Sequence, residues 1–151
     1  MDTVARSLMN KVPEMGRFSV EFEVANNIDV GQVSLGQLQP DQARRITING
    51  VVDPGATRLV LPVEIVKRLG VPKAGRTKTR YADGRVGQRD VVDEVRVTLQ
   101  GRSRVFDSIV EPKRKTVLIG AIVLETLDFV VDCAIQKLVP RDPKQIVSEL
   151  E

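Results

Sequence analysis

One aspartate of the chain stands in a setting suited to acid–base chemistry. Asp53 follows two apolar residues and precedes the apolar run Leu59–Leu61, so its carboxylate is expected on a turn that emerges from a buried strand. The chain has no histidine, which excludes Ser-His and Cys-His nucleophile pairs, histidine zinc sites and an imidazole base. Acid–base catalysis near neutral or acid pH would therefore use carboxylates. The residues of this turn are Asp53, Pro54, Gly55, Ala56 and Thr57.

Two later segments could surround such a turn. The stretch Thr77–Leu99 is predicted to form two strands around a tight-turn signal. The tip of that hairpin consists of Ala82, Asp83 and Gly84. A short apolar strand, Thr116–Ile119, is followed by a predicted helix, Ala121–Leu127. The last two residues of this strand, with the glycine that precedes the helix, are Leu118, Ile119 and Gly120.

The preceding segments indicate strands with little helix. Phe18–Val24 alternates apolar and polar residues, which is the period of a half-buried strand. Asn26–Pro40 is rich in Asn, Gln and Gly and is predicted to be a loop with short extended pieces. Ala43–Val52 has a strand pattern that the turn signal Asn49-Gly50 interrupts, which predicts a hairpin. Val63–Leu69 is predicted to be a short helix.

Length and composition favour one β-rich domain. The chain has 151 residues, of which 42% are hydrophobic and 28% charged, as is ordinary for a soluble globular protein. Aromatic residues make up only 3%, so the core must consist mainly of Val, Leu and Ile, which favour strands. We expect residues 1–17 to form an N-terminal arm, residues 18–140 the domain, and residues 141–151 a C-terminal tail.

The charge and the single cysteine limit the expected partners. A net charge of +3 is too small to indicate nucleic acid, and the basic groups Lys113–Lys115 and Arg76, Lys78 and Arg80 are predicted to be solvated. Cys133 has no partner for an internal disulfide, and no apolar run is long enough for a signal peptide or a membrane span. We therefore expect a cytoplasmic protein that needs no metal or cofactor and binds neither nucleic acid nor membrane.

Taken in order, the three segments at Asp53, Ala82–Gly84 and Leu118–Gly120 resemble the retropepsin-like (retroviral-type) aspartic protease family, in the form of a bacterial single-domain member. In that family the first segment is usually Asp-Thr/Ser-Gly-Ala, the hairpin is a flap over the substrate, and the apolar-apolar-Gly segment runs under the catalytic turn. The resemblance covers roughly residues 18–140. It implies a mostly β fold, an acid-protease barrel with one short C-terminal helix that forms a two-fold homodimer.

The resemblance also implies a mechanism and a substrate. Two aspartates hydrolyse a peptide bond when one acts as base on a water and the other as acid on the carbonyl, the pair sharing one proton. A chain with one such motif must dimerise to supply the second carboxylate, so Asp53 from each copy would form the catalytic pair. The substrate would be an extended peptide or protein segment held between flap and floor.

Pro54 departs from the family pattern. Thr or Ser is usual at this position, where the hydroxyl crosses the dimer axis to the backbone of the other chain, and proline has neither a hydroxyl nor an N–H. A second hypothesis follows from this, namely a catalytically weakened or inactive dimer that keeps the fold and binds peptide or a partner protein. A basic nucleic-acid binder is a third, and the low net charge argues against it.

Overall fold

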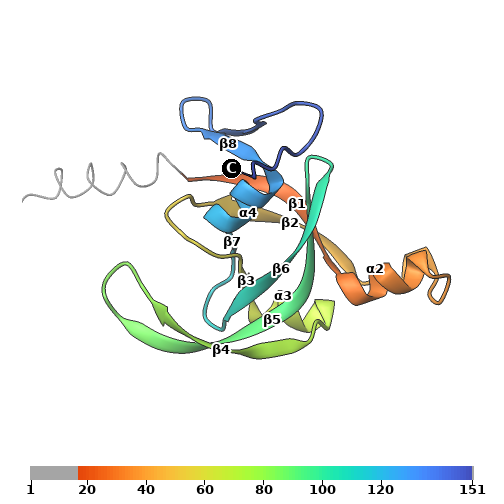
Figure 1. Cartoon of the computed structure of the whole chain (residues 1–151). Coiled ribbons are helices and arrows are strands. Elements are labelled where there is room, and N and C mark those ends of the chain that lie inside the picture. The colour runs from red at the N-terminus through yellow and green to blue at the C-terminus, as the bar shows by residue number, and fades with distance from the viewer. Residues whose placement is uncertain (1–16, 151) are drawn as a thin grey trace, which may run out of the picture.

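Strands make up most of the computed structural model of the chain, which describes residues 17–150 (Figure 1). The strands are β1 (Phe18–Asn26), β2 (Arg45–Val52), β3 (Val60–Pro62), β4 (Lys73–Arg80), β5 (Val86–Leu99), β6 (Arg102–Glu111), β7 (Val117–Ile119), β8 (Phe129–Asp132) and β9 (Lys137–Pro140). The helical segments are α2 (Asn27–Ser34), α3 (Val63–Leu69), α4 (Ala121–Leu127) and the 3-10 turn η1 (Pro40–Gln42). The predicted mostly β class is confirmed, and α2 is present besides α3, which the sequence predicts, and the one C-terminal helix that the resemblance implies.

Six of the strands close into a barrel. Their order is β1-β2-β7-β3-β6-β5, and β1 pairs with β5 to complete the ring. The long strand β5 continues past the barrel to pair with β4, and this β4–β5 hairpin curves away from the barrel body (Figure 1). Because the ring is closed, each of the six strands has a neighbouring strand on both sides. The hairpin β8–β9 forms a separate two-stranded sheet.

The barrel interior is filled by branched aliphatic side chains, as the composition predicts. Its fully buried members include Val24, Val52, Leu61, Val97 and Ile119. They come from strands that alternate buried and exposed residues, so one face of each strand points inward. Val52 and Ile119 are paired across β2 and β7, which places the core directly beneath the segment that carries Asp53.

The hairpin predicted at Asn49-Gly50 is wrong. Both residues lie inside the continuous strand β2, where Gly50 pairs with Val20 of β1. A Cβ atom at Gly50 would lie 2.5 Å from Cε1 of Phe22 and 3.0 Å from Cδ1 of Ile119. Glycine is therefore required here by close packing, and the turn signal it gives in the sequence is misleading.

The loop predicted over Asn26–Pro40 is also wrong, because its first part forms α2. The side chain of Asn26 caps this helix by accepting a hydrogen bond from the Asp29 N–H at 3.1 Å, and its amide donates to the Leu69 carbonyl at 2.9 Å. The buried Asp29 carboxylate accepts from the Arg44 guanidinium at 2.7 and 3.0 Å. Polar contacts to the barrel thus stabilise a helix that projects from it (Figure 1).

Other predicted elements are confirmed. The helices Val63–Leu69 and Ala121–Leu127 have the predicted bounds, and α3 ends at Gly70 in the left-handed conformation, with a φ of 64°. The hairpin tip Ala82–Gly84 lies between β4 and β5. Within residues 17–150, no helix is both long and apolar enough to cross a membrane.

Arg102, Asp128 and Arg141 connect the C-terminal residues to the domain. The Arg102 guanidinium donates hydrogen bonds to the carbonyls of Leu127, Asp128, Asp142 and Gln145. The Asp128 carboxylate accepts in turn from the Val147 N–H at 3.0 Å. The tail as far as Val147 therefore has defined contacts with the domain, whereas all of the predicted arm except Arg17 lies outside the described residues.

Candidate active site

The Asp53 turn is held in place by backbone hydrogen bonds. Strand β2 runs parallel to β7, and at their ends the Asp53 N–H donates to the Ile119 carbonyl at 3.0 Å. The Ala56 N–H donates to the Asp53 carbonyl, also at 3.0 Å, and closes the turn. Asp53 itself is buried. Its position is therefore set by the main chain of the barrel.

The two oxygens of the Asp53 carboxylate have different partners. Oδ1 accepts a hydrogen bond from the Gly55 N–H at 3.0 Å. A Cβ atom at Gly55 would lie 3.2 Å from the same oxygen, which is why this position suits glycine. Oδ2 lies 3.3 Å from the guanidinium of Arg17, a side chain that is half exposed. One oxygen is thus committed to the turn, while the other has, among residues 17–150, a half-exposed surface side chain as its partner.

Leu118, Ile119 and Gly120 lie directly against the Asp53 turn. The first two residues of α4 donate their N–H groups to the turn, Ala121 to the Ala56 carbonyl at 2.8 Å and Ile122 to the Thr57 carbonyl at 2.9 Å. A Cβ atom at Gly120 would lie 2.4 Å from the Arg58 carbonyl oxygen. Gly120 therefore allows the backbone at the start of α4 to lie directly against the turn. We call Leu118–Gly120 and the first two residues of α4 the floor of the site. Of the three predicted segments, the structure brings these two together.

Side-chain contacts with Glu111 of β6 anchor the hairpin whose tip is the third segment, Ala82–Gly84. Tyr81 donates its hydroxyl proton to Glu111 at 2.7 Å, and the Arg89 Nε donates to the other oxygen of Glu111 at 2.7 Å. Burial, followed by the contact with Glu111, raises the pKa of Tyr81 above its ordinary value. Among the described residues, no hydrogen bond or ion pair joins Ala82–Gly84 to the Asp53 turn.

Two arginines near Asp53 were not singled out from the sequence. Arg17 precedes β1, whose first residue Phe18 pairs with Val52, so the strand register places Arg17 opposite Asp53. Arg114 lies in the basic link before β7, where its Nε donates to the Thr116 carbonyl at 2.8 Å. Burial, with the charge of Arg17 as the second cause, lowers the pKa of Arg114 from its ordinary value. Neither placement can be read from composition, because both depend on strand register.

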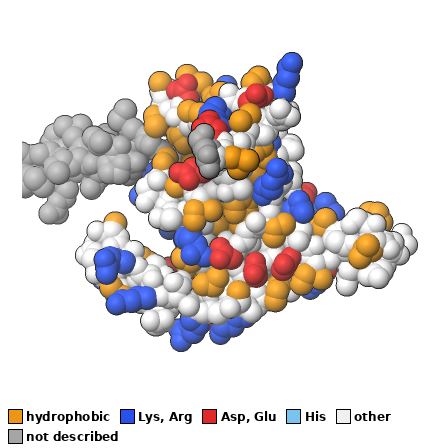
Figure 2. Space-filling model, in the orientation of Figure 1, with side chains coloured by type: hydrophobic (Ala, Val, Ile, Leu, Met, Phe, Trp, Pro, Cys, Tyr) orange, Lys and Arg blue, Asp and Glu red, His pale blue; other side chains and the backbone are white. Residues whose placement is uncertain are grey.

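The basic row of β4 is exposed, as predicted. Arg76, Lys78 and Arg80 all point to solvent on one face of the strand, and Figure 2 shows Lys and Arg side chains gathered along this edge of the molecule. The Asp90 carboxylate lies 3.2 Å from Lys73 and 3.4 Å from Arg76. Among residues 17–150, no ion pair joins this row to the Asp53 turn.

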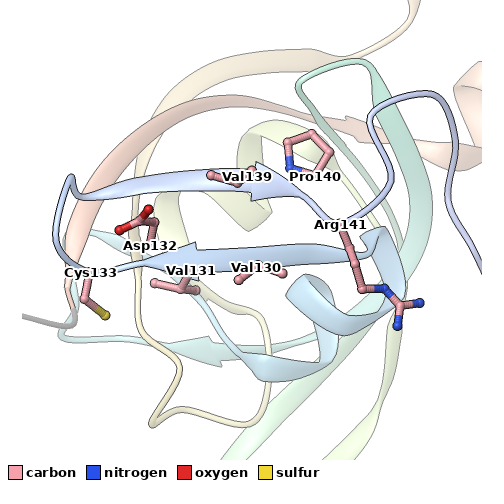
Figure 3. A pocket seen from close by; sticks show the side chains of 7 residues that line it. All are labelled: Val130, Val131, Asp132, Cys133, Val139, Pro140 and Arg141. Atoms are coloured by element: carbon pink, nitrogen blue, oxygen red, sulfur yellow. The ribbon is translucent and has the colours of Figure 1, made fainter.

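The surface hollow shown in Figure 3 lies over the β8–β9 hairpin and contains no part of the Asp53 turn. Its lining includes the cross-strand pair Val130 and Val139 and the exposed thiol of Cys133. Between residues 17 and 150, no group of three or more Cys, Asp and Glu side chains is arranged to hold a metal ion. Asp53 therefore remains the residue about which a chemical site can be built.

Comparisons with known proteins found resemblance only among solved structures. No protein-family model matches the chain. The search of curated proteins found no match. Over 52% of its length the chain is similar to EIAV protease in complex with the inhibitor HBY-793, with 21% identity, a TM-score of 0.46 and 75% of that chain covered. It is also similar to simian foamy virus (mac) protease, with 18% identity, a TM-score of 0.41, and 52% and 80% of the two chains covered. Both TM-scores are below 0.5, so the function proposed next rests on the geometry of the Asp53 turn.

Proposed function

We propose that the protein is an aspartic endopeptidase that acts as a homodimer, with one Asp53 from each subunit. The observation that carries the proposal is the asymmetry of the Asp53 carboxylate. Oδ1 is fixed by the Gly55 N–H, and within the described part of the chain the partner of Oδ2 is Arg17. A rigid carboxylate with one displaceable partner is what a shared acid–base pair requires.

In the dimer, the two turns would face each other across the symmetry axis. Oδ2 of each Asp53 would leave Arg17 and approach the partner's carboxylate, with one proton shared because two like charges so close cannot both ionise. The ionised carboxylate takes a proton from water, whose oxygen attacks the peptide carbonyl, while the protonated carboxyl donates its proton to the carbonyl oxygen. Collapse of the gem-diol intermediate breaks the C–N bond, as one carboxyl donates its proton to the leaving amine and the other carboxylate takes a proton from a hydroxyl of the intermediate. Two products and the original protonation state result.

The substrate would be an extended segment of polypeptide. The β4–β5 hairpin extends beyond the barrel with β4 as an edge strand, and an edge strand can hydrogen-bond to an added peptide strand. Ala82–Gly84 would then serve as the flap that covers the substrate above the Asp53 turn. No cofactor is needed for this chemistry.

The proposal is tested by digestion of an unfolded protein from about pH 3 to about pH 8, the range in which a shared carboxyl proton is gained and lost. Asp53→Asn keeps the size of the side chain and removes the acid–base group. Asp41→Asn is the matched control, because Asp41 is exposed and lies in η1. Cleavage that disappears with Asp53→Asn and with a general aspartic-protease inhibitor, and persists in Asp41→Asn, supports the enzyme. No cleavage by a proven dimer at any pH would contradict it.

A subunit-mixing experiment tests the shared pair directly. When wild-type and Asp53→Asn chains are mixed one to one and exchange freely, about one dimer in four keeps both carboxylates. Activity per total protein should fall to about that fraction if both copies of Asp53 are needed. A fall to only about half would show that each subunit works alone.

A second candidate is a non-catalytic dimer that binds peptide, and Pro54 is the observation that favours it. Pro54 is exposed at the start of the turn and has no hydroxyl or N–H to offer across a dimer axis. Pro54→Thr would supply a hydroxyl. A tighter dimer and faster cleavage in that variant would show that Pro54 weakens the enzyme, whereas peptide binding without cleavage in both forms would favour the binding module.

A further inference from the structure

The open edge of the seven-stranded sheet is β4. It stands last in the strand order, and between residues 17 and 150 its only neighbouring strand is β5. An edge strand has one row of backbone N–H and carbonyl groups that no neighbouring strand pairs. Such a row can form hydrogen bonds with an added strand of polypeptide.

The register of the hairpin shows which residues of β4 direct their backbone groups to this edge. The Tyr81 N–H donates across the hairpin to the Arg85 carbonyl at 2.9 Å. The same pairing continues without a shift from Arg80 back to Arg76. The hydrogen bonds of an antiparallel strand alternate between its two sides. Tyr81 bonds toward β5, so Arg80, Lys78 and Arg76 direct their N–H and carbonyl groups outward.

The same three residues place positive charge along the edge. Their side chains are exposed and lie on one face, because residues two apart on a strand point to the same side. The strand contains four basic residues and no acidic one. Within the described part of the chain, the carboxylate that contacts them belongs to Asp90 of β5, 3.2 Å from Lys73 and 3.4 Å from Arg76. An unpaired backbone is thus lined by a basic row that one carboxylate compensates only in part.

Charge and spacing favour one class of ligand for this edge. A second copy of β4 would bring basic side chains opposite these, and like charges on neighbouring strands are destabilising. A nucleic acid would find no aromatic side chain on β4 for stacking, and it would not form strand-type hydrogen bonds with the backbone. An extended polypeptide would form them, and its alternate side chains lie about 7 Å apart, as those of β4 do. Carboxylates at alternate positions would therefore lie opposite the basic row.

We propose that β4 binds, as an added strand, an extended acidic segment of the substrate in which alternate residues are Asp or Glu. The inference names the substrate class of the proposed function, and it rests on that function for calling the bound segment a substrate. Backbone pairing and charge pairing are its two parts, and each part has its own test.

The charge pairing is tested by fluorescence anisotropy with the Asp53→Asn protein, which prevents turnover. One peptide has Glu at three alternate positions, and two others have Gln or Lys at those positions. The Glu peptide should bind about tenfold more tightly than the Gln peptide, because cross-strand pairs of opposite charge are gained. A peptide of the same composition with its three Glu residues consecutive has equal charge, and it should lose most of this gain.

The backbone pairing is tested with two N-methylated forms of the Glu peptide. One form is methylated on the Glu nitrogens, and the other on the nitrogens of the residues between them. An added strand directs only one of these two sets toward β4, so one form should bind at least about tenfold more weakly than the other. Equal binding of the two forms would overturn strand addition.

Double variants of the protein locate the effect. Lys78→Gln with Arg80→Gln should reduce the preference for Glu over Gln to about twofold, since one basic residue of the row remains. Lys78→Glu with Arg80→Glu should reverse the preference in favour of the Lys peptide. Arg104→Gln with Lys137→Gln is the matched control, because it removes the same charge from exposed residues of β6 and β9. The control should keep the full preference.

Initial cleavage rates of the same peptides, measured with the Asp53 protein, let the two proposals fail separately. A preference for Glu that the Lys78 and Arg80 variants remove and reverse, without cleavage, supports the β4 site while the proposed activity fails. Cleavage with equal binding of the Glu, Gln and Lys peptides overturns the β4 site and leaves the endopeptidase standing. A single-stranded oligonucleotide that binds more tightly than the Glu peptide, and is lost in the same variants, would make nucleic acid the ligand and overturn the inference.

Discussion

The floor beneath Asp53 and the tip of the β4–β5 hairpin are held by different kinds of contact. On the floor, backbone groups bond directly to backbone groups, as Ala121 does to Ala56 at 2.8 Å. At the hairpin the contacts run through side chains, with Tyr81 and Arg89 both donating to Glu111. Backbone packing leaves no room for substitution, whereas side-chain contacts can be removed one at a time. The stability of the floor should therefore depend little on pH and salt, whereas the stability of the hairpin tip should change when a single charged side chain is removed.

The largest expected effect tests the floor. Gly120→Ala places a Cβ atom 2.4 Å from the Arg58 carbonyl oxygen and 2.8 Å from that of Ala56, so backbone must move and the free energy of unfolding should fall by about 3 kcal/mol. Chemical denaturation measures this loss. Gly31→Ala is the control, since nothing lies within 4 Å of its added Cβ atom in α2 and helix propensity should raise stability by up to about 1 kcal/mol. Equal effects of the two variants would contradict the close packing at Gly120.

A smaller effect is expected at the hairpin. Glu111→Gln removes the charge that Arg89 contacts at 2.7 Å, and the local free energy of opening at the tip should fall by about 1–2 kcal/mol. Hydrogen exchange of the Tyr81 and Gly84 amides, which bond within the tip, reports this opening. Global unfolding should change little, because tips open locally.

The matched control for the hairpin is Glu125→Gln. Glu125 is an exposed carboxylate of α4, so its neutralisation changes the net charge equally without touching the tip. Unaltered protection of the Tyr81 and Gly84 amides in Glu111→Gln would show that the tip does not depend on this side chain, and the contrast with the floor would then be lost.

As the pH falls, the peripheral contacts of Asp29 and Asp128 should open before the backbone hydrogen bonds of the floor do. The Arg44 side chain lowers the pKa of Asp29, and the Val147 N–H is the first cause that lowers the pKa of Asp128. A carboxyl with a lowered folded-state pKa contributes stability above its ordinary value of about 4, and this contribution is lost as the pH falls through the lowered value. Amide exchange at Arg44 and Val147, which bond to these carboxylates, should therefore rise below about pH 4.

Asp29→Asn separates the two acid effects. In this variant the acid-dependent change at the Arg44 amide should disappear, whereas that at Val147 should remain, because Asp128 is intact. The Asp53 amide bonds to the Ile119 carbonyl and should exchange faster only at a lower pH than the Arg44 and Val147 amides. If its exchange accelerates at a higher pH than theirs, the prediction that the periphery opens first is contradicted.

The smallest effect on stability is expected for Arg17, whose side chain contacts the Asp53 carboxylate from the surface. Arg17→Gln removes the partner at 3.3 Å from Asp53 Oδ2, and because the arginine is half exposed the pair should contribute only about 1 kcal/mol. If Arg17 competes for this oxygen, initial cleavage rates should rise by up to about fivefold. Arg45→Gln, which removes a similarly exposed arginine from its ion pair with Glu23, should leave the rate unchanged. A slower Arg17→Gln protein would mean that Arg17 assists the reaction.

Local patterns in the sequence were enough to predict the elements whose reasons are local. The helix Val63–Leu69 ends where Gly70 adopts a left-handed conformation, and β5 follows the turn at Asp83-Gly84. By contrast, Gly50 is required by the ring of Phe22 and the side chain of Ile119, contacts made only after β1, β2 and β7 pair. Glycine is thus required by the local backbone conformation at Gly70 and by tertiary packing at Gly50.

The candidate site divides in the same way. Asp53, Gly55 and Gly120 could be predicted because their types suit a tight turn and a close backbone approach. Arg17 could not, since it reaches Asp53 only through the pairing of Phe18 with Val52. The helix α2 was missed because its stability comes from Asn26 and from Asp29 with Arg44, while its own apolar pattern is weak.

The closure of the barrel by β1 and β5 has a consequence for folding speed. Glu23 pairs with Thr98, about 75 positions later, and the strands that carry Asp53 and Gly120 are joined across a similar separation. Loops of this length must close before such pairs add stability, so we expect a high relative contact order and folding in milliseconds to seconds. The geometry of the Asp53 turn would then be completed among the last steps of folding, and a partly folded chain would not contain it.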